Sequence, residues 1–519
     1  MPEILRRRST PPILALSAVV ALVVVFVLLN GSGSQGAANT GLAGYMPPDS
    51  VAYAETDLRP GGRIEAEVDE VVRTLTGSSL RAALDEALSR PKGSGVDYRE
   101  EVEPWLAGPV ALSAGGSSSD FALVAEAGDL DAARDLAAEL ENGDGLPAGA
   151  RAGVVGNALV VARSTAWLDQ VAEAYAGDSL AGTTLFADSM ESVPEDGVAS
   201  LFISNAALLD SLQTENVAAS EVLETLGVDP EGTATAMTLA VDGDSVSLRG
   251  SSGLTVGAEA TGAGELIETF PADSLIAAGS GEVGETLGKL MEAAGETGAD
   301  PDGSAPGQSG PDGAADGIGE LFGQASAFGI DLEGLVASLE TAGVFVTGDP
   351  EGDMGGALVA TTTDPDLVQD SIQSISTLGA FAGGDLFRAL PGGLDGFSIK
   401  LPGMPRGRVA IASSGDRLVI ALGVEAARAG LDPAQRTLGD ADLYRQATAD
   451  LSDGEQIGLF ARPSSLAPLV GEKVRDHGGR RDSRRAGAKQ VKGLIRGIET
   501  IVASSGQEGS FEVELGLKD

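Results

Sequence analysis

Short phrases recur in the same order in the two halves of this 519-residue chain, and this internal repeat limits the folds open to it. Residues 47–50 (PPDS) match residues 271–274 (PADS), and each phrase stands directly before an apolar segment. The other matched pairs are, in chain order, residues 95–97 with 329–331, 123–125 with 358–360, 156–160 with 415–419, and 201–202 with 459–460. Because the order is kept and insertions account for the changing spacing, the repeat predicts two tandem copies of one module.

Each copy has the periodicity of an α+β module with a mainly antiparallel sheet and packed helices, one face of the sheet being covered. Asp129 and Asp364 stand where N-caps would begin the helices that follow the first hairpins. Alternating or apolar runs predict the following segments: strands 50–58 and 274–279, an amphipathic helix 63–90, strands 110–113 with 121–125, strands 343–347 with 356–360, and closing hairpins at 236–249 and 500–515.

The N-terminus predicts a membrane anchor. The segment from Ile13 to Leu29 is uncharged and apolar apart from Ser17, and a helix of this length is about 25 Å long, near the lower limit for crossing a bilayer. Three arginines, Arg6 to Arg8, precede it, and no basic residue follows until Arg59. The positive-inside rule therefore predicts a single-pass protein with a cytoplasmic N-terminus and an extracytoplasmic body. A cleaved signal peptide is the alternative, although the apolar run is longer than usual for one.

These features divide the chain into successive regions. Residues 1–12 are expected to be a cytoplasmic basic tail, residues 13–29 a transmembrane signal-anchor helix and residues 30–44 a flexible tether. The first module is predicted at 45–255 and the second at 256–519. The second module is expected to contain a disordered insert at 295–317, rich in Pro, Gly and Asp, and a basic loop at 471–496.

The charge and cysteine content exclude several functions. The formal net charge is −43, so the body lacks the basic face that nucleic-acid binding requires. The chain contains no cysteine, which excludes disulfides, thiolate nucleophiles and cysteine-ligated zinc. No cofactor is predicted.

Two phrases are similar to those of a known family. MPPDSVAYAETDL at 46–58 and VDYREEVEPWLAG at 96–108 resemble a bacterial family of membrane-anchored proteins, domain of unknown function 3352. The Pro-Trp-Leu-Gly phrase of that family occurs here with one inserted alanine, at 104–108, and the second copy keeps neither the proline nor the tryptophan. The resemblance covers most of residues 45–515. It implies an anchored extracytoplasmic module and supplies no known catalytic residue.

The residues do not indicate a catalytic or metal site. The single histidine, His477, lies in a basic Gly-rich segment rather than among packed neighbours, and no nucleophile elbow, Walker loop or zinc-protease motif occurs. Carboxylate pairs are uninformative among 77 acidic residues. Asp349, Glu351 and Asp353 alternate as calcium ligands can, but they break the EF-hand pattern and are typical of a hairpin turn. Trp105 and Trp167 are expected in the core rather than at a ligand.

The basic loop is the one candidate binding region. Residues 471–496 contain nine basic and three acidic residues, whereas the chain as a whole is strongly acidic. Such a cluster can dock on anionic lipid heads or an anionic wall polymer, whereas the simpler interpretation is a solvated segment partly neutralised by the acidic body. The residues proposed for docking are Lys473, Arg475, Arg480, Arg481, Arg484, Arg485, Lys489 and Lys492.

Taken together, these features favour a membrane-anchored extracytoplasmic protein of the cell envelope that binds a partner or organises the surface without catalysis. Its expected partners are the lipid bilayer, through Ile13 to Leu29, and an envelope protein or an anionic polymer. Two alternatives stay open. A carboxylate-dependent envelope hydrolase would need two carboxylates and a raised pKa in one pocket. A lipid-handling module would need an enclosed apolar cavity between sheet and helices.

Overall fold

A computed structural model describes most of the chain beyond the N-terminal 40 residues. The described residues are in the main 41–58, 63–76, 98–207, 230–253, 262–288, 331–382, 387–400, 408–468 and 495–518, with short gaps inside these ranges. The predicted cytoplasmic tail, the membrane anchor from Ile13 to Leu29 and the predicted insert at 295–317 lie outside them. Among the helices that are described, none combines the length and the apolar character needed to span a membrane.

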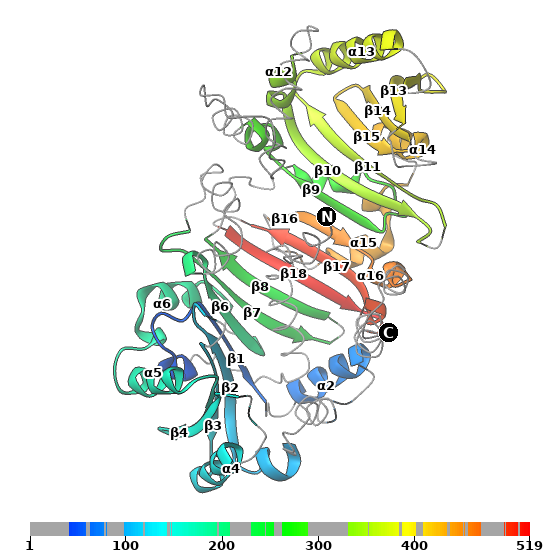
Figure 1. Cartoon of the computed structure of the whole chain (residues 1–519). Helices are drawn as coiled ribbons and strands as arrows, with labels where there is room; N and C mark the ends of the chain where they lie inside the picture. The colour runs from blue at the N-terminus through cyan, green and yellow to red at the C-terminus, as the bar shows by residue number, and fades with distance from the viewer. Residues whose placement is uncertain are drawn as a thin grey trace, which may run out of the picture.

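The described strands form one antiparallel sheet of eighteen strands, which confirms the α+β class and the mainly antiparallel sheet (Figure 1). The strands before residue 255 are β1 (Ala52–Asp57), β2 (Leu106–Ala114), β3 (Phe121–Ala127), β4 (Arg151–Val155), β5 (Ala158–Ala162), β6 (Ala199–Ser204), β7 (Ala234–Asp242) and β8 (Ser245–Ser252). The later strands are β9 (Ile276–Ser280), β10 (Leu339–Gly348), β11 (Met354–Thr362), β12 (Phe387–Ala389), β13 (Asp395–Lys400), β14 (Arg408–Ser414), β15 (Arg417–Leu422), β16 (Gln456–Ala461), β17 (Ile498–Ser505) and β18 (Ser510–Leu517).

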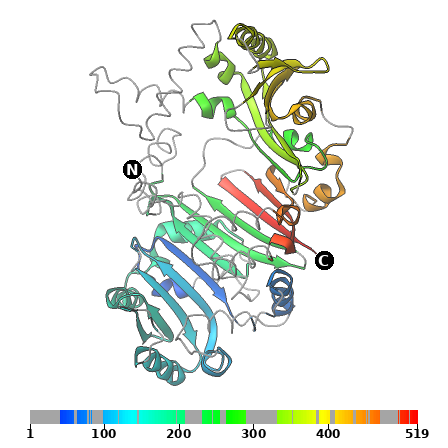
Figure 2. The same ribbon diagram turned by 45° about the vertical axis from the view of Figure 1, so that its right-hand side comes forward.

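The pairings place these strands in a single row with two open edges, β4 and β12. The row runs β4-β5-β3-β2-β1-β6-β7-β8-β18-β17-β16-β9-β10-β11-β15-β14-β13-β12. At its centre β8 pairs with β18, a contact we call the seam, where Leu248 lies opposite Val513. The Arg249 Nε–Glu512 Oε1 ion pair, 2.7 Å long, crosses the seam. Figure 2 shows the strands of both halves continuing through the seam without interruption.

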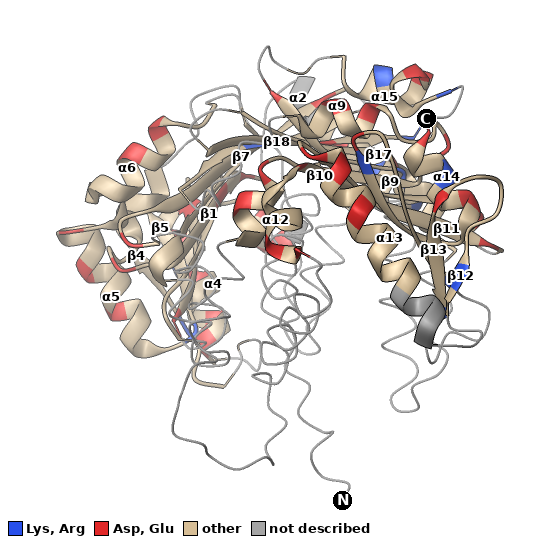
Figure 3. Ribbon diagram, turned by 90° about the horizontal axis from the view of Figure 1, so that it is seen from above, with Lys and Arg blue, Asp and Glu red and all other residues tan. Residues whose placement is uncertain are grey.

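Helices lie on both faces of the sheet, which differs from the expectation of one covered face. Figure 3 shows the sheet bent into an arch, with α4, α12 and α13 on its inner side and α5, α6 and α14 on its outer side. The helices in the first half are η2 (Gly41–Tyr45), α2 (Arg63–Thr76), η3 (Tyr98–Val102), α4 (Leu130–Asn142), α5 (Thr165–Ala176), η4 (Leu180–Gly182) and α6 (Thr184–Glu191). Those in the second half are α9 (Ala263–Glu268), α12 (Leu332–Ala337), α13 (Pro365–Ala382), α14 (Val424–Leu431), η5 (Leu438–Asp440), α15 (Asp442–Ala447) and α16 (Pro463–Leu466).

Strand β1 and its neighbours are buried on both faces, with an apolar core on each side of the sheet. Tyr53 and Phe202 lie on the outer face under η2, α5 and α6. Ala54 and Leu201 point to the other face, where they meet Met237. A strand buried on both faces shows a continuous apolar run rather than strict alternation, so periodicity alone could not reveal the second layer of helices.

The tether predicted for residues 30–44 overlaps the packed structure at its end. Gly41–Tyr45 form η2, in which Leu42, Ala43 and Tyr45 are buried in the same core as Tyr53. The sequence before Tyr45 is rich in Gly and Ala, and only one large apolar side chain, Leu42, marks this turn as part of the core. The packed body therefore includes Gly41–Tyr45.

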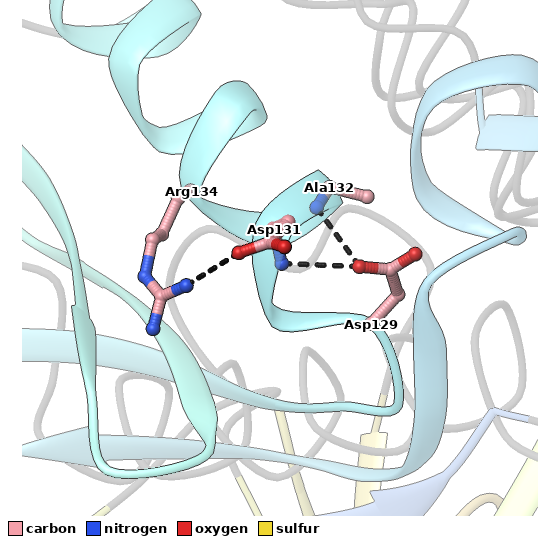
Figure 4. Close-up of polar contacts among 4 residues, drawn as sticks. All are labelled: Asp129, Asp131, Ala132 and Arg134. Carbon is pink, nitrogen blue, oxygen red and sulfur yellow. Dashed lines mark hydrogen bonds and ion pairs between the residues drawn. The ribbon is translucent and has the colours of Figure 1, made fainter.

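The predicted helix caps are confirmed. The Asp129 Oδ1 atom accepts the backbone N–H groups of Asp131, at 3.0 Å, and of Ala132, at 3.1 Å, at the start of α4 (Figure 4). In the same way Asp364 Oδ1 accepts the N–H of Leu367 before α13. These carboxylates satisfy first-turn donors that have no partner inside a helix.

We expect Asp129→Ala to lower the free energy of unfolding by about 1 kcal/mol, because it leaves two N–H groups of α4 without an acceptor. Asp131→Ala is the matched control, since the Asp131 side chain forms an exposed ion pair with Arg134 and accepts no first-turn N–H in Figure 4. Urea unfolding of both variants measures the difference. Equal losses in the two variants would contradict a capping role for Asp129.

Candidate functional site

A hollow of about 790 Å³ opens at one end of the strands in the second half. Five elements and the segment that follows β9 surround it, and its wall carries mostly acidic and hydroxyl side chains. The lining residues are Gly262, Glu265, Leu266 and Thr269 around α9, Glu282 and Glu285 after β9, Ala337, Leu339, Glu340 and Thr341 where α12 meets β10, Thr361 on β11, and Asp416 and Arg417 at the start of β15. A volume of this size is within the usual range for small-molecule sites.

Hydrogen bonds fix the floor of the hollow. Arg417 donates from Nη2 to Thr269 Oγ1 at 3.1 Å and from Nη1 to the Gly430 carbonyl at 3.2 Å. The Thr341 and Thr361 hydroxyls are 2.6 Å apart on neighbouring strands. At the rim, Glu282 has a φ of 48°, in the left-handed region that residues other than glycine rarely adopt. The hollow is therefore a preformed feature with a strained residue at its rim.

The chemistry of the hollow favours positively charged groups over anions, because five carboxyl side chains surround the single guanidinium of Arg417. Among the described residues, no three or more His, Asp or Glu side chains form a group able to hold a metal ion. Of the three residues considered for calcium, Asp349 and Asp353 are described, whereas Glu351 lies outside the described residues. Asp349 and Asp353 flank the tight β10–β11 turn, where the Gly352 N–H donates to the Asp349 carbonyl.

A second feature is a row of exposed aliphatic side chains across three hydrogen-bonded strands. Val344 on β10 lies opposite Leu358 on β11, and Leu358 lies opposite Ile420 on β15. Their exposed fractions are 40%, 44% and 40%, and Leu422, two residues beyond Ile420, is 52% exposed. We call these four residues the aliphatic row.

The aliphatic row breaks the usual alternation of an antiparallel strand, in which the face away from the core is polar. The residues next to the row, Phe345, Val359 and Val419, are fully buried on the opposite face. Helix α13 packs on the same face as the row, against Ile411 and Leu418, but leaves the row itself exposed. The apolar surface on this face of the sheet therefore extends beyond the part that α13 covers.

The third feature is a buried carboxyl group in the first half. Glu55 on β1 is 3% exposed, and its Oε2 atom accepts the Tyr53 hydroxyl and, at 3.3 Å, the N–H of Leu42 in η2. Its Oε1 atom has no hydrogen-bond partner among the described residues. Burial raises the pKa of Glu55 to about 8, while the two hydrogen bonds act in the opposite direction and the nearby Glu126 and Asp57 charges add to the rise. Burial likewise raises the pKa of Tyr53 well above its usual value.

Polar contacts also hold the far end of η2. The Tyr45 hydroxyl donates to Asn157 Oδ1 at 2.5 Å, and the Asn157 side-chain amide donates to Glu126 Oε1 at 3.0 Å. The Tyr45 ring stacks on Tyr175 of α5 with 4.6 Å between ring centroids. Both ends of η2 are thus attached to the sheet and its helices.

The structure settles some of the predicted site residues and leaves others untested. Trp105 and Trp167 are each 3% exposed, which confirms their place in the core. The Trp105 indole N–H donates to the Glu101 carbonyl. His477 lies outside the described residues, as do all eight proposed docking residues, Lys473, Arg475, Arg480, Arg481, Arg484, Arg485, Lys489 and Lys492.

Sequence reasoning missed all three features. The hollow is assembled from five separated segments, and no local pattern links them. Glu55 stands in the run AYAETD, where alternation with Ala54 and Thr56 makes it look like a solvent-facing residue. The aliphatic row did leave a signal, since Leu358 stands between two apolar neighbours that cannot all face one core.

The chain was compared with protein-family models, curated proteins and solved structures, and none of them matches it. The resemblance to the domain-of-unknown-function family therefore remains a prediction that depends on the two quoted phrases.

Proposed function

We propose that this protein is a membrane-anchored, extracytoplasmic binding module without catalytic activity, which takes an envelope protein as its partner on the aliphatic row. The observation that carries the proposal is the row itself. Large contiguous apolar patches are uncommon on soluble monomers, and such patches mark interaction surfaces. Val344, Leu358 and Ile420 lie side by side on paired strands, so one partner surface could contact all three.

We further propose that the two halves are copies of one module that meet at the seam. The strand order supports this idea, because β5-β3-β2-β1-β6-β7-β8 and β15-β11-β10-β9-β16-β17-β18 correspond strand by strand. The β8–β18 pairing then joins equivalent strands of the two copies edge to edge.

Matching local contacts support the same idea. The Ser50 hydroxyl donates to the Pro47 carbonyl at 2.7 Å, and the Ser274 hydroxyl donates to the Pro271 carbonyl at the same distance. Tyr53 pairs with Phe202 across β1 and β6, as Ala277 pairs with Phe460 across β9 and β16. In this alignment Glu55 corresponds to Gly279, so the buried carboxyl belongs to the first copy alone.

The alternatives fit the described residues less well. A carboxylate-dependent hydrolase needs its raised-pKa acid at an accessible site, but Glu55 is sealed in the first half and the acidic hollow lies in the second. A lipid-handling module needs an apolar cavity, whereas carboxyl groups line the hollow.

The anchor and the basic loop belong to the same proposal. Export by the segment from Ile13 to Leu29 would place the acidic body outside the cytoplasm, next to other envelope proteins. The basic residues from Lys473 to Lys492 would then hold the body near anionic lipid heads or wall polymers. The resemblance to the anchored family agrees with this topology.

The experiment is capture of the full-length chain after a membrane-impermeant crosslinker has been added to intact cells. We expect one stoichiometric protein partner with the native chain, and loss of most of it with Leu358→Thr/Ile420→Thr. Threonine keeps the strand preference of both sites while removing the aliphatic contact.

The matched control is Leu287→Thr, an aliphatic residue 37% exposed outside the row. We expect this variant to retain the partner. Recovery of the same partner with the double variant would show that the row is not the binding surface. Absence of any crosslinked partner with the native chain would contradict the proposed function itself.

A further inference from the structure

The first described turn of the chain, η2, is held against the sheet by a buried acid. It spans Gly41–Tyr45 and is the described element that follows residue 40 in the chain. The Leu42 N–H donates to Glu55 Oε2, and the Leu42 and Ala43 side chains are buried beside Tyr53. Glu55 therefore lies directly beneath the first described turn of the chain.

No basic group compensates the charge of Glu55 within the described residues. The strands on either side of β1 place Ala111 and Ser200 opposite Glu55, and neither side chain titrates. Tyr53 and Asp57 on β1 and Glu126 on β3 are the other titratable groups that act on it. All of them are acidic, so an ionised Glu55 has hydrogen-bond donors but no opposite charge.

The elements that pack on η2 add no basic group either. η2 itself carries only Tyr45, and α5 contributes Tyr175, which stacks on it. The acidic residues of the two nearby helices face solvent, namely Asp169 and Glu173 on α5 and Asp188 and Glu191 on α6. An isolated carboxylate in such surroundings gains more from water than from the two donors it keeps.

We infer that η2 and Glu55 form a pH-responsive clasp, in which the protonated carboxyl keeps η2 packed on the sheet and loss of its proton releases η2. The geometry accounts for the release, since η2 covers Glu55 through the Leu42 N–H bond and belongs to no strand, so it can move without breaking a strand pairing. Opening lets water reach the carboxylate, including the Oε1 atom that has no partner in the described structure. The clasp is independent of the proposed partner binding.

The direction and size of the effect follow from the two states. In the closed state the pKa of Glu55 is about 8, and in the open, hydrated state it returns towards its usual 4.5. Between these values the closed state binds one proton more than the open state. The opening constant therefore rises about tenfold per pH unit between roughly pH 5 and pH 8, which is a factor of several hundred over that interval.

Hydrogen exchange of the full-length chain tests the clasp. The probes are the backbone amides of Leu42, Met46 and Leu180. The Leu42 N–H donates to Glu55 Oε2, the Met46 N–H to the Ala43 carbonyl, and the Leu180 N–H to the Met46 carbonyl. After correction for intrinsic exchange, we expect their opening constants to rise several hundredfold from pH 5 to pH 8. The Val359 amide in the second half is the internal reference and should show no such rise.

Two variants separate the clasp from general pH effects. Glu55→Gln cannot ionise and should make the opening constants of the probes independent of pH. Asp57→Asn, a neighbouring acid on the same strand, should keep the steep dependence of the native chain. A flat response in the native chain, or an unchanged slope in Glu55→Gln, would overturn the clasp. A flat response in Asp57→Asn would assign the effect to Asp57 instead and overturn it as well.

Discussion

Gly250→Ala should lower the free energy of unfolding by about 3 kcal/mol, because the added methyl group has no room beside the seam. A Cβ at Gly250 would lie 2.3 Å from the Ala236 carbonyl oxygen and 2.9 Å from the Met237 Cα atom. Both are backbone atoms of the neighbouring strand β7, and they cannot rotate away as a flexible side chain could. Strand β8 would have to shift, and with it the pairing of Gly250 with Phe511 in β18.

The matched control is Gly116→Ala, at a site with no heavy atom within 4 Å of the added carbon. We expect a change in stability close to zero there. Urea unfolding monitored by circular dichroism measures both variants. If the two variants lose the same stability, the close contact of β8 with β7 is not a constraint on the seam.

Glu55→Gln should become more stable relative to the native chain as the pH rises from 5 to 8. In the folded protein the pKa of Glu55 is about 8, against its usual 4.5 in the unfolded chain. Between these values the folded state binds more protons, so its stability falls with rising pH by about 1.4 kcal/mol per unit. Between pH 5 and pH 8 the loss is on the order of 4 kcal/mol. Glutamine does not titrate and removes this loss.

The measurement is the free energy of unfolding at several pH values for the native chain, Glu55→Gln and Asp57→Asn. The Asp57→Asn curve should run parallel to the native one. Release of η2 exposes Glu55 before the sheet unfolds, so the native slope should level off at the pH where η2 is mostly open. Parallel curves for the native chain and Glu55→Gln would contradict the assigned ionisation of Glu55.

The parts of the fold that the sequence predicted depend on local chemistry. The hairpin at residues 236–249 is confirmed, and Gly243 at its tip has a φ of 58° that glycine adopts without strain. The caps at Asp129 and Asp364 are confirmed because a carboxylate reaches the first-turn N–H groups of the helix that follows it. Each of these features is determined by residues within a few positions of one another.

The parts that were missed depend on contacts between residues far apart in the chain. The seam joins Leu248 to Val513, and no signal in either strand specifies the other as its partner. Burial of Glu55 depends on η2 folding over it, which a Gly-rich segment does not suggest. The hollow and the aliphatic row form only when β10, β11 and β15 lie side by side.

The seam also protects the chain from self-association. Two separate sheets of the eight and ten described strands would expose four edges, whereas the joined sheet of described strands ends at β4 and β12. An open strand edge offers unpaired N–H and C=O groups to any other extended chain, which is a common start of amyloid-like aggregation. A change that separates β8 from β18 therefore exposes two unpaired strand edges within one molecule. Such a change would therefore make the protein insoluble before any loss of partner binding could be measured.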